Sequence, residues 1–210
     1  AIVSGVVGAQ LDAGIILILG LANLIGDGFS MASGAFISSR SDREFYERER
    51  ERESWEVDHF PEGEKEELYQ LYLAQGYPEA DARQLVEIKS KDRERWVDSM
   101  MIEELGLLKD EKQPIKEALA TFSAFVLAGS MPLLIYFLDL LLPFTLTPSA
   151  AFMVAMMLTG AALVGLGAAK TLVTRRSPWI SGLEMLVVGG LAAGVAYLIG
   201  ALLKGVVGFG

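Results

Sequence analysis

Long apolar stretches and one strongly polar block divide this chain of 210 residues. A helix needs about 20 mostly apolar residues to cross a lipid bilayer. Four stretches meet this requirement, the first of them interrupted by one charge, Asp27; they are residues 13–39, 117–142, 149–173 and 177–203. The pattern therefore predicts four membrane-spanning helices, with the polar block between the first two.

Nine mostly apolar residues, 1–9, precede the first of these stretches. They are too short to cross a bilayer as a helix, so we interpret them as the end of a helix that starts before Ala1. The predicted fold is an all-α integral membrane protein with a bundle of five transmembrane helices, the first of them truncated. The expected domains are residues 1–39 with helices one and two, 40–112, and 113–210 with helices three to five.

The polar block, residues 40–112, is itself predicted to be helical. Residues 41–56 contain neither Gly nor Pro, Gly76 suits the end of a second helix, and Pro78 suits the start of a third. We therefore expect a three-helix domain inserted between the second and third spans.

Charge is concentrated in the same block. It holds 22 acidic and 13 basic residues, which accounts for the whole net charge of −9. Nucleic acid is excluded as a partner because phosphate binding needs a basic surface, whereas cations suit such a block. The chain has no cysteine, so a metal site here cannot use thiolates.

Basic residues predict which side of the membrane the block faces. Lys116, Lys170, Arg175 and Arg176 flank the spans on the same side as the basic residues that begin at Arg40. Positively charged loops remain in the cytosol, so we expect the polar block to be cytosolic.

Four glutamates of the block are spaced as metal ligands would be. Glu53 and Glu56 are three residues apart, as are Glu64 and Glu67, so each pair shares one face of a helix. Like charges on one face repel, and a divalent cation between them would remove that repulsion. The alternative is a solvated charged face, since arginines alternate with these acids.

A methionine pair adds a softer kind of ligand. Met100 precedes Glu104 by four residues, and Met101 is its neighbour. A thioether beside carboxylates favours a softer ion such as iron(II) over magnesium or calcium, although plain packing is the alternative for both methionines. His59, the only histidine, is either a further ligand or a solvated loop residue.

The acidic residue Asp27 lies within the first predicted span. Asp27 and Met31 are four residues apart, on one face of the helix. A charge at bilayer depth usually faces a polar pathway or a partner, so these two residues are predicted to line a transport pathway. The alternative is a helix-packing motif, because the segment is rich in small residues.

Three segments together resemble the vacuolar iron transporter family: "DGFSM" at 27–31, "SMMIEELGL" at 99–107 and "RRSPWISGLEMLVVGGLAAGVAYLIG" at 175–200. The resemblance covers nearly the whole chain. It implies five transmembrane helices, a cytosolic three-helix metal-binding domain, and a homodimer that moves ferrous iron out of the cytosol in exchange for protons.

The resemblance also assigns residues. The implied metal ligands of the cytosolic domain are Glu53, Glu56, Glu64, Glu67, Met100, Met101 and Glu104. Met31 corresponds to the pathway methionine of the family, with Asp27 in support, while the pathway aspartate falls in the first half of the first helix, before Ala1.

We therefore expect a transporter that exports ferrous iron, with manganese as the second candidate ion and cobalt or zinc behind it. No cofactor and no enzymatic activity are expected, since the chain has no nucleophile–base pair, phosphate-binding glycine loop or His/Cys cluster. The alternatives are a membrane-anchored metal buffer or sensor, and a structural membrane protein whose polar block binds a partner helix. The expected location is a prokaryotic plasma membrane, with the vacuolar membrane as the alternative.

Overall fold

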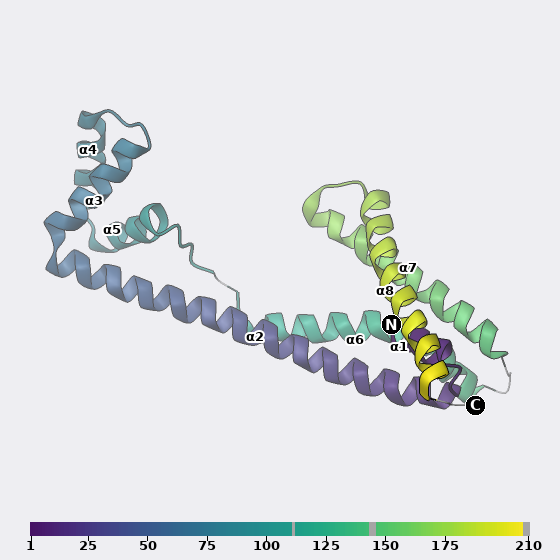
Figure 1. Cartoon of the computed structure of the whole chain (residues 1–210). Coiled ribbons are helices and arrows are strands. Elements are labelled where there is room, and N and C mark those ends of the chain that lie inside the picture. The colour runs from purple at the N-terminus through teal and green to yellow at the C-terminus, as the bar shows by residue number, and fades with distance from the viewer. Residues whose placement is uncertain (111, 143–145, 208–210) are drawn as a thin grey trace. The chain divides into compact units, whose positions relative to one another are not determined.

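The computed structural model describes residues 1–110, 112–142 and 146–207, and over these residues the chain is all-helical (Figure 1). The elements in chain order are α1 (Ile2–Gly8), α2 (Ala13–His59), α3 (Pro61–Ala74), α4 (Glu79–Lys89), α5 (Arg93–Ser99), the π-helix η1 (Met100–Glu104), α6 (Pro114–Leu141), α7 (Pro148–Thr174) and α8 (Pro178–Val207). The predicted all-α class is confirmed for these parts of the chain.

The chain divides into two compact units. The span unit comprises Ala1–Ser33 and Ala118–Gly210, and the polar unit comprises Gly34–Glu117. By length and composition, α2, α6, α7 and α8 could each cross a membrane, which confirms the four apolar helices predicted from the sequence. Between α2 and α6 lie only the short helices of the polar unit.

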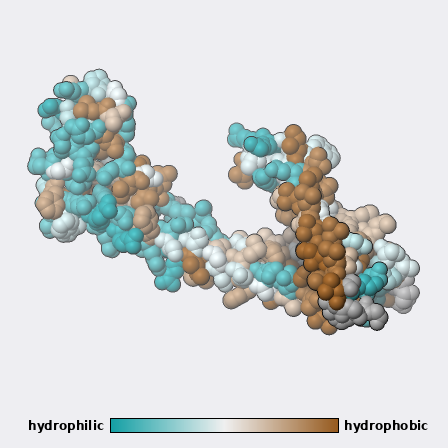
Figure 2. All heavy atoms as spheres, in the orientation of Figure 1, coloured by the Kyte–Doolittle hydropathy of each residue, from teal (hydrophilic) through white to brown (hydrophobic). Residues whose placement is uncertain are grey.

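Glycines let the helices of the span unit approach closely. A Cβ atom added to Gly167 on α7 would lie 2.6 Å from the Cα of Gly182 on α8. A Cβ added to Gly8 on α1 would lie 3.1 Å from the backbone carbonyl carbon of Tyr197 on α8. Small residues of this kind are typical of helix contacts in membranes. The visible face of α8 is almost uniformly apolar, as a lipid-facing surface requires (Figure 2).

The apolar span and the acidic segment after it form one continuous helix, α2. No Gly or Pro occurs between Gly34 and Pro61, so nothing in the sequence interrupts the backbone hydrogen bonds. Ion pairs at i, i+4 support its polar part, with Arg40 and Glu44 2.6 Å apart and Arg43 and Glu47 2.8 Å apart.

The prediction of one continuous third helix in the polar block is wrong. The structure divides it into α4, α5 and η1. The break follows Lys89, and the carboxylate of Asp92 accepts a hydrogen bond of 3.1 Å from the backbone N–H of Arg95, which caps the start of α5. Gly76 has a φ of +94° just after α3, consistent with its predicted place at that helix end.

The polar unit has a small apolar core of its own. Its helices meet around fully buried side chains that include Leu68 of α3, Val97 of α5 and Met100 and Met101 of η1. Burying these side chains offsets part of the cost of ordering a unit that is otherwise rich in charge.

Replacing Gly167 with Ala is expected to destabilise the span unit. The new methyl group would collide with the backbone of α8, and overpacking costs about 1–3 kcal/mol. The apparent Tm in detergent should therefore fall by several degrees. Gly165→Ala is the matched control, because nothing lies within 4 Å of a Cβ at that position. Equal Tm values for the two variants would contradict the close α7–α8 contact.

Candidate metal centre

Three helices of the polar unit bring five glutamates together. Carboxylate oxygens of Glu53 and Glu56 on α2 and of Glu64 on α3 all lie within 4.8 Å of one another. The same holds for Glu64, Glu67 on α3 and Glu104 on η1. We call the first group the Glu53 triad and the second the Glu104 triad. The triads share Glu64, and each could hold one divalent cation.

A turn of one residue brings the glutamates of α2 and α3 into reach. α2 ends at His59, Phe60 adopts a φ of −130° and a ψ of 47°, and α3 starts at Pro61. The backbone N–H of Phe60 still donates to the carbonyl of Glu56 at 2.7 Å, while the carbonyl of Phe60 accepts from Glu64 at 3.1 Å. Proline fits this first helical position because it has no N–H to satisfy.

Two of the five carboxylates are removed from solvent. Glu53 is 1% exposed and Glu64 is 5% exposed. Within the described residues, the Oε2 atom of Glu64 is buried and has no hydrogen-bond partner. A buried oxygen without a partner is costly, and a cation at the place where both triads meet would satisfy it.

Burial and mutual repulsion change the acidity of the cluster. Burial, followed by the charges of Glu67 and Glu53, raises the pKa of Glu64 to about 7. Burial is also the largest cause that raises the pKa of Glu104 to about 7, with Glu53 and Glu67 next. Glu104 is the more exposed of the two, and solvent weakens such effects, so Glu64 should show its shift more clearly.

Contacts outside the triads hold η1 in position. The ammonium of Lys89 on α4 donates to Glu103 at 2.8 Å and to the hydroxyl of Ser99 at 3.0 Å. That hydroxyl donates in turn to the carbonyl of Arg95 at 2.8 Å. These bonds fix the two ends of the segment that carries Glu104. A π-helical turn of this kind often occurs at functional sites.

Besides the glutamates, two methionines and one histidine of the polar unit were candidate ligands, and each lies in other surroundings. Met100 and Met101 are both fully buried and belong to its apolar core, on the same short helix as Glu104. His59 belongs to neither triad, because its Nδ1 atom lies 2.7 Å from the carbonyl of Trp55 and its ring stacks on Trp55.

In the sequence, Arg52 is one of several arginines that alternate with the acids of a charged helix face. Its guanidinium lies 3.0 Å from a carboxylate oxygen of Glu53, 3.0 Å from one of Glu49 and 3.7 Å from one of Glu56. The spacing to Glu49 and to Glu56, three residues back and four residues on, could have indicated these contacts.

The two predicted pathway residues of the span unit, Asp27 and Met31, differ in their surroundings. Asp27 lines a hollow of about 390 Å³ that α2 shares with neighbouring helices, together with the polar side chains of Asn23 and Thr159. Met31 is 50% exposed and does not line this hollow. Asn23 and Thr159 are polar positions that the sequence analysis did not single out.

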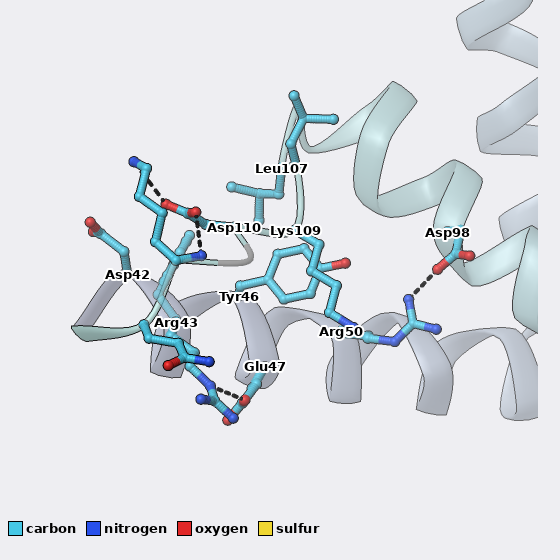
Figure 3. A pocket seen from close by; sticks show the side chains of 13 residues that line it. Asp42, Arg43, Tyr46, Glu47, Arg50, Asp98, Leu107, Lys109 and Asp110 are labelled. Atoms are coloured by element: carbon cyan, nitrogen blue, oxygen red, sulfur yellow. Dashed lines mark hydrogen bonds and ion pairs between the residues drawn. The ribbon is translucent and has the colours of Figure 1, made fainter. Parts of the chain in front are cut away.

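A hollow of about 940 Å³ in the polar unit lies between α2 and residues 107–110, 112 and 113 (Figure 3). It is lined by four acidic and four basic residues, and most of them pair with one another: Arg43 with Glu47, Arg50 with Asp98 and Lys112 with Asp110. No triad residue lines it. Because opposite charges balance there, it does not offer the acidic environment of a cation site.

Comparison with known proteins identifies the family of this chain. The model of the VIT family matches residues 1–201. The vacuolar iron transporter of Toxoplasma gondii is 40% identical over 213 aligned positions, which cover 99% of this chain and 70% of that protein. The vacuolar iron transporter of Plasmodium falciparum is 33% identical, over 97% of this chain and 76% of that protein. Vacuolar iron transporter 1 of Arabidopsis thaliana is 30% identical, over 97% and 80%.

These matches extend over both units, so they include the four long apolar helices as well as the triads. The chain is thus a multi-pass membrane protein and not an enzyme, and it belongs to the VIT family.

Proposed function

We propose that this chain transports ferrous iron across a membrane and that its two triads collect the ion first. The observation that carries the proposal is the convergence of five carboxylates from α2, α3 and η1, with a buried, unpartnered oxygen of Glu64 at their common point. The similar proteins named as iron transporters support iron as the ion.

The choice of ion follows from the ligands. Carboxylate oxygens alone would suit magnesium, calcium or manganese. Met100 and Met101 lie on the same helix as Glu104, and a thioether ligand would favour iron(II) and other later metals. Iron(II) accepts both kinds of ligand, which places it first, with manganese second and cobalt and zinc as further candidates.

We propose that the protein exports iron(II) from the cytosol in exchange for protons. The basic residues beside the spans favour a cytosolic polar unit, so the triads would collect metal from the cytosol. With its pKa raised to about 7, Glu64 would release a proton as metal binds, which is the elementary step of an exchange. Asp27 and Met31 would serve the membrane part of the pathway, in a homodimer of five-span chains.

Two kinds of membrane are candidates for the location of this protein. The relatives named above are vacuolar iron transporters, which favours a vacuolar or similar intracellular membrane. A prokaryotic plasma membrane is the other candidate. In either case the proposal keeps the polar unit on the cytosolic side, where the ion is collected.

A membrane-anchored metal buffer or sensor is the second candidate function. The same triads would then bind iron without passing it on. Loading of the triads is common to both functions, so only ion accumulation behind a sealed membrane distinguishes them.

Glu64→Gln is expected to weaken metal binding at both triads, because they share this residue. Loss of one ligand should lower the affinity of the purified full chain for Mn²⁺ by roughly tenfold or more, as measured by isothermal titration calorimetry. Glu66→Gln is the matched control, since Glu66 is exposed on the same helix and bonds Gln70 instead. If both variants bind Mn²⁺ as the wild type does, the triads are not the metal site.

Metal affinity should depend on pH near neutrality. Below about pH 7 Glu64 is protonated in the metal-free protein, and an incoming ion has to displace that proton. The apparent affinity for Mn²⁺ should therefore fall by about tenfold per pH unit below 7 and level off above it. Glu64→Gln should make the profile shallower by about one proton in this range, while Glu104 accounts for the remaining slope, and an unchanged profile would show that Glu64 is not responsible.

Met31→Ala should impair transport but leave the triads intact. In proteoliposomes with an imposed pH gradient, the wild type is expected to accumulate iron(II), and Met31→Ala should accumulate far less while binding Mn²⁺ normally. Met153→Ala, which removes an exposed methionine of α7, is the control. Normal transport by Met31→Ala would remove Met31 from the pathway, and binding without accumulation by the wild type would favour the buffer.

A further inference from the structure

The two triads differ in how their negative charge is neutralised. In the Glu53 triad, the guanidinium of Arg52 lies 3.0 Å from Glu53 and 3.7 Å from Glu56. In the Glu104 triad, no basic side chain of the described residues lies within 4.0 Å of the carboxylates of Glu64, Glu67 or Glu104. Arg52 is therefore in direct contact with the Glu53 triad, whereas it acts on the Glu104 triad only at longer range, through its charge on Glu104.

Arg52 is held strongly enough to compete with an ion. Its Nη2–H group donates to Oε1 of Glu53 at 3.0 Å, and its Nη1 atom lies 3.0 Å from Oε2 of Glu49. Hydrogen bonds between charged groups are roughly twice as strong as those between neutral ones. Glu53 is almost completely buried, so its carboxylate needs a partner, and within the triad only Arg52 supplies one in the metal-free protein.

The guanidinium of Arg52 is also exposed enough to separate from Glu53. Its side chain is 51% exposed, so its charge can move into water at small cost. Glu49 lies outside both triads and can keep one end of the guanidinium when the other end releases Glu53. The contact with Glu53 can thus be exchanged for a metal ion without any change in the helices.

We propose that Arg52 is an internal competitor for the metal and that it sets the affinity of the Glu53 triad. It occupies Glu53 and Glu56 while the triad is empty, and an incoming ion has to displace it. The Glu104 triad consequently fills first and the Glu53 triad second. This inference rests on the proposed function, since it requires that the triads bind metal.

The same competition provides selectivity by charge. A monovalent ion carries no more charge than the guanidinium and lacks its directed hydrogen bonds, so Na⁺ or K⁺ gains nothing by replacing Arg52. A divalent ion brings twice the charge into a site with low exposure, where electrostatic attraction is strong. Arg52 therefore keeps the Glu53 triad closed to the abundant monovalent cations.

The test compares Arg52→Gln with Arg48→Gln in the purified full chain. Arg48 is on the same helix, and its only ion pair among the described residues is with Glu49, at 3.6 Å, so it controls for the loss of one positive charge. Calorimetric titration with Mn²⁺ should resolve a tighter and a weaker class of sites in the wild type. Arg52→Gln should tighten the weaker class by about tenfold or more, the size expected for lost charge-assisted hydrogen bonds, and leave the tighter class within about threefold.

Each outcome has a distinct meaning. Weaker or unchanged binding by Arg52→Gln overturns the role of Arg52, as does an equal gain in Arg48→Gln. If the wild type itself binds no Mn²⁺, the proposed metal site fails instead. Should Arg52→Gln not fold, Arg52→Lys tests the same point, because a single ammonium cannot reproduce the fork to Glu49 and Glu53; the weaker class should again tighten, and unchanged affinity overturns the proposal.

Discussion

Repulsion among five carboxylates is the constraint around which the polar unit is built. Two of them, Glu53 and Glu64, are buried, where water cannot screen their charge. Three kinds of partner can balance this charge. Protons can bind near neutrality because the pKa of Glu64 is raised, and the guanidinium of Arg52 contacts Glu53. In the proposed function, a metal ion is the third partner. A site that can be balanced in three ways can also exchange one partner for another.

The apolar core of the polar unit keeps the repelling groups together. Leu68 lies one turn after Glu64 on α3, and Met100 lies one turn before Glu104 on η1; both are fully buried. The same short helices thus present apolar side chains to the core and carboxylates to the triads. In the span unit, where lipid provides no such driving force, close contact depends instead on glycines such as Gly167.

The sequence was sufficient to predict the helical class, the four apolar helices and the glutamate pairs, because these depend on local spacing and composition. It was not sufficient to predict the break at Asp92, which depends on a side chain that caps α5 in competition with a continuous helix. The role of Arg52 was missed for a different reason. Its neighbours Glu49 and Glu56 follow from helix periodicity, but its importance appears only once α3 has folded back and buried Glu53.

The position of Glu64 in both triads has a consequence for how an ion would move. Separate sites would require a bound ion to regain its full hydration shell between them, which is slow and costly for a divalent cation. Here an ion that passes from one triad to the other can keep Glu64 as a ligand throughout and exchange only the remaining two carboxylates. In the proposed function, the shared glutamate would make the pair of sites a short stepwise path along which the ion would pass without being released into water.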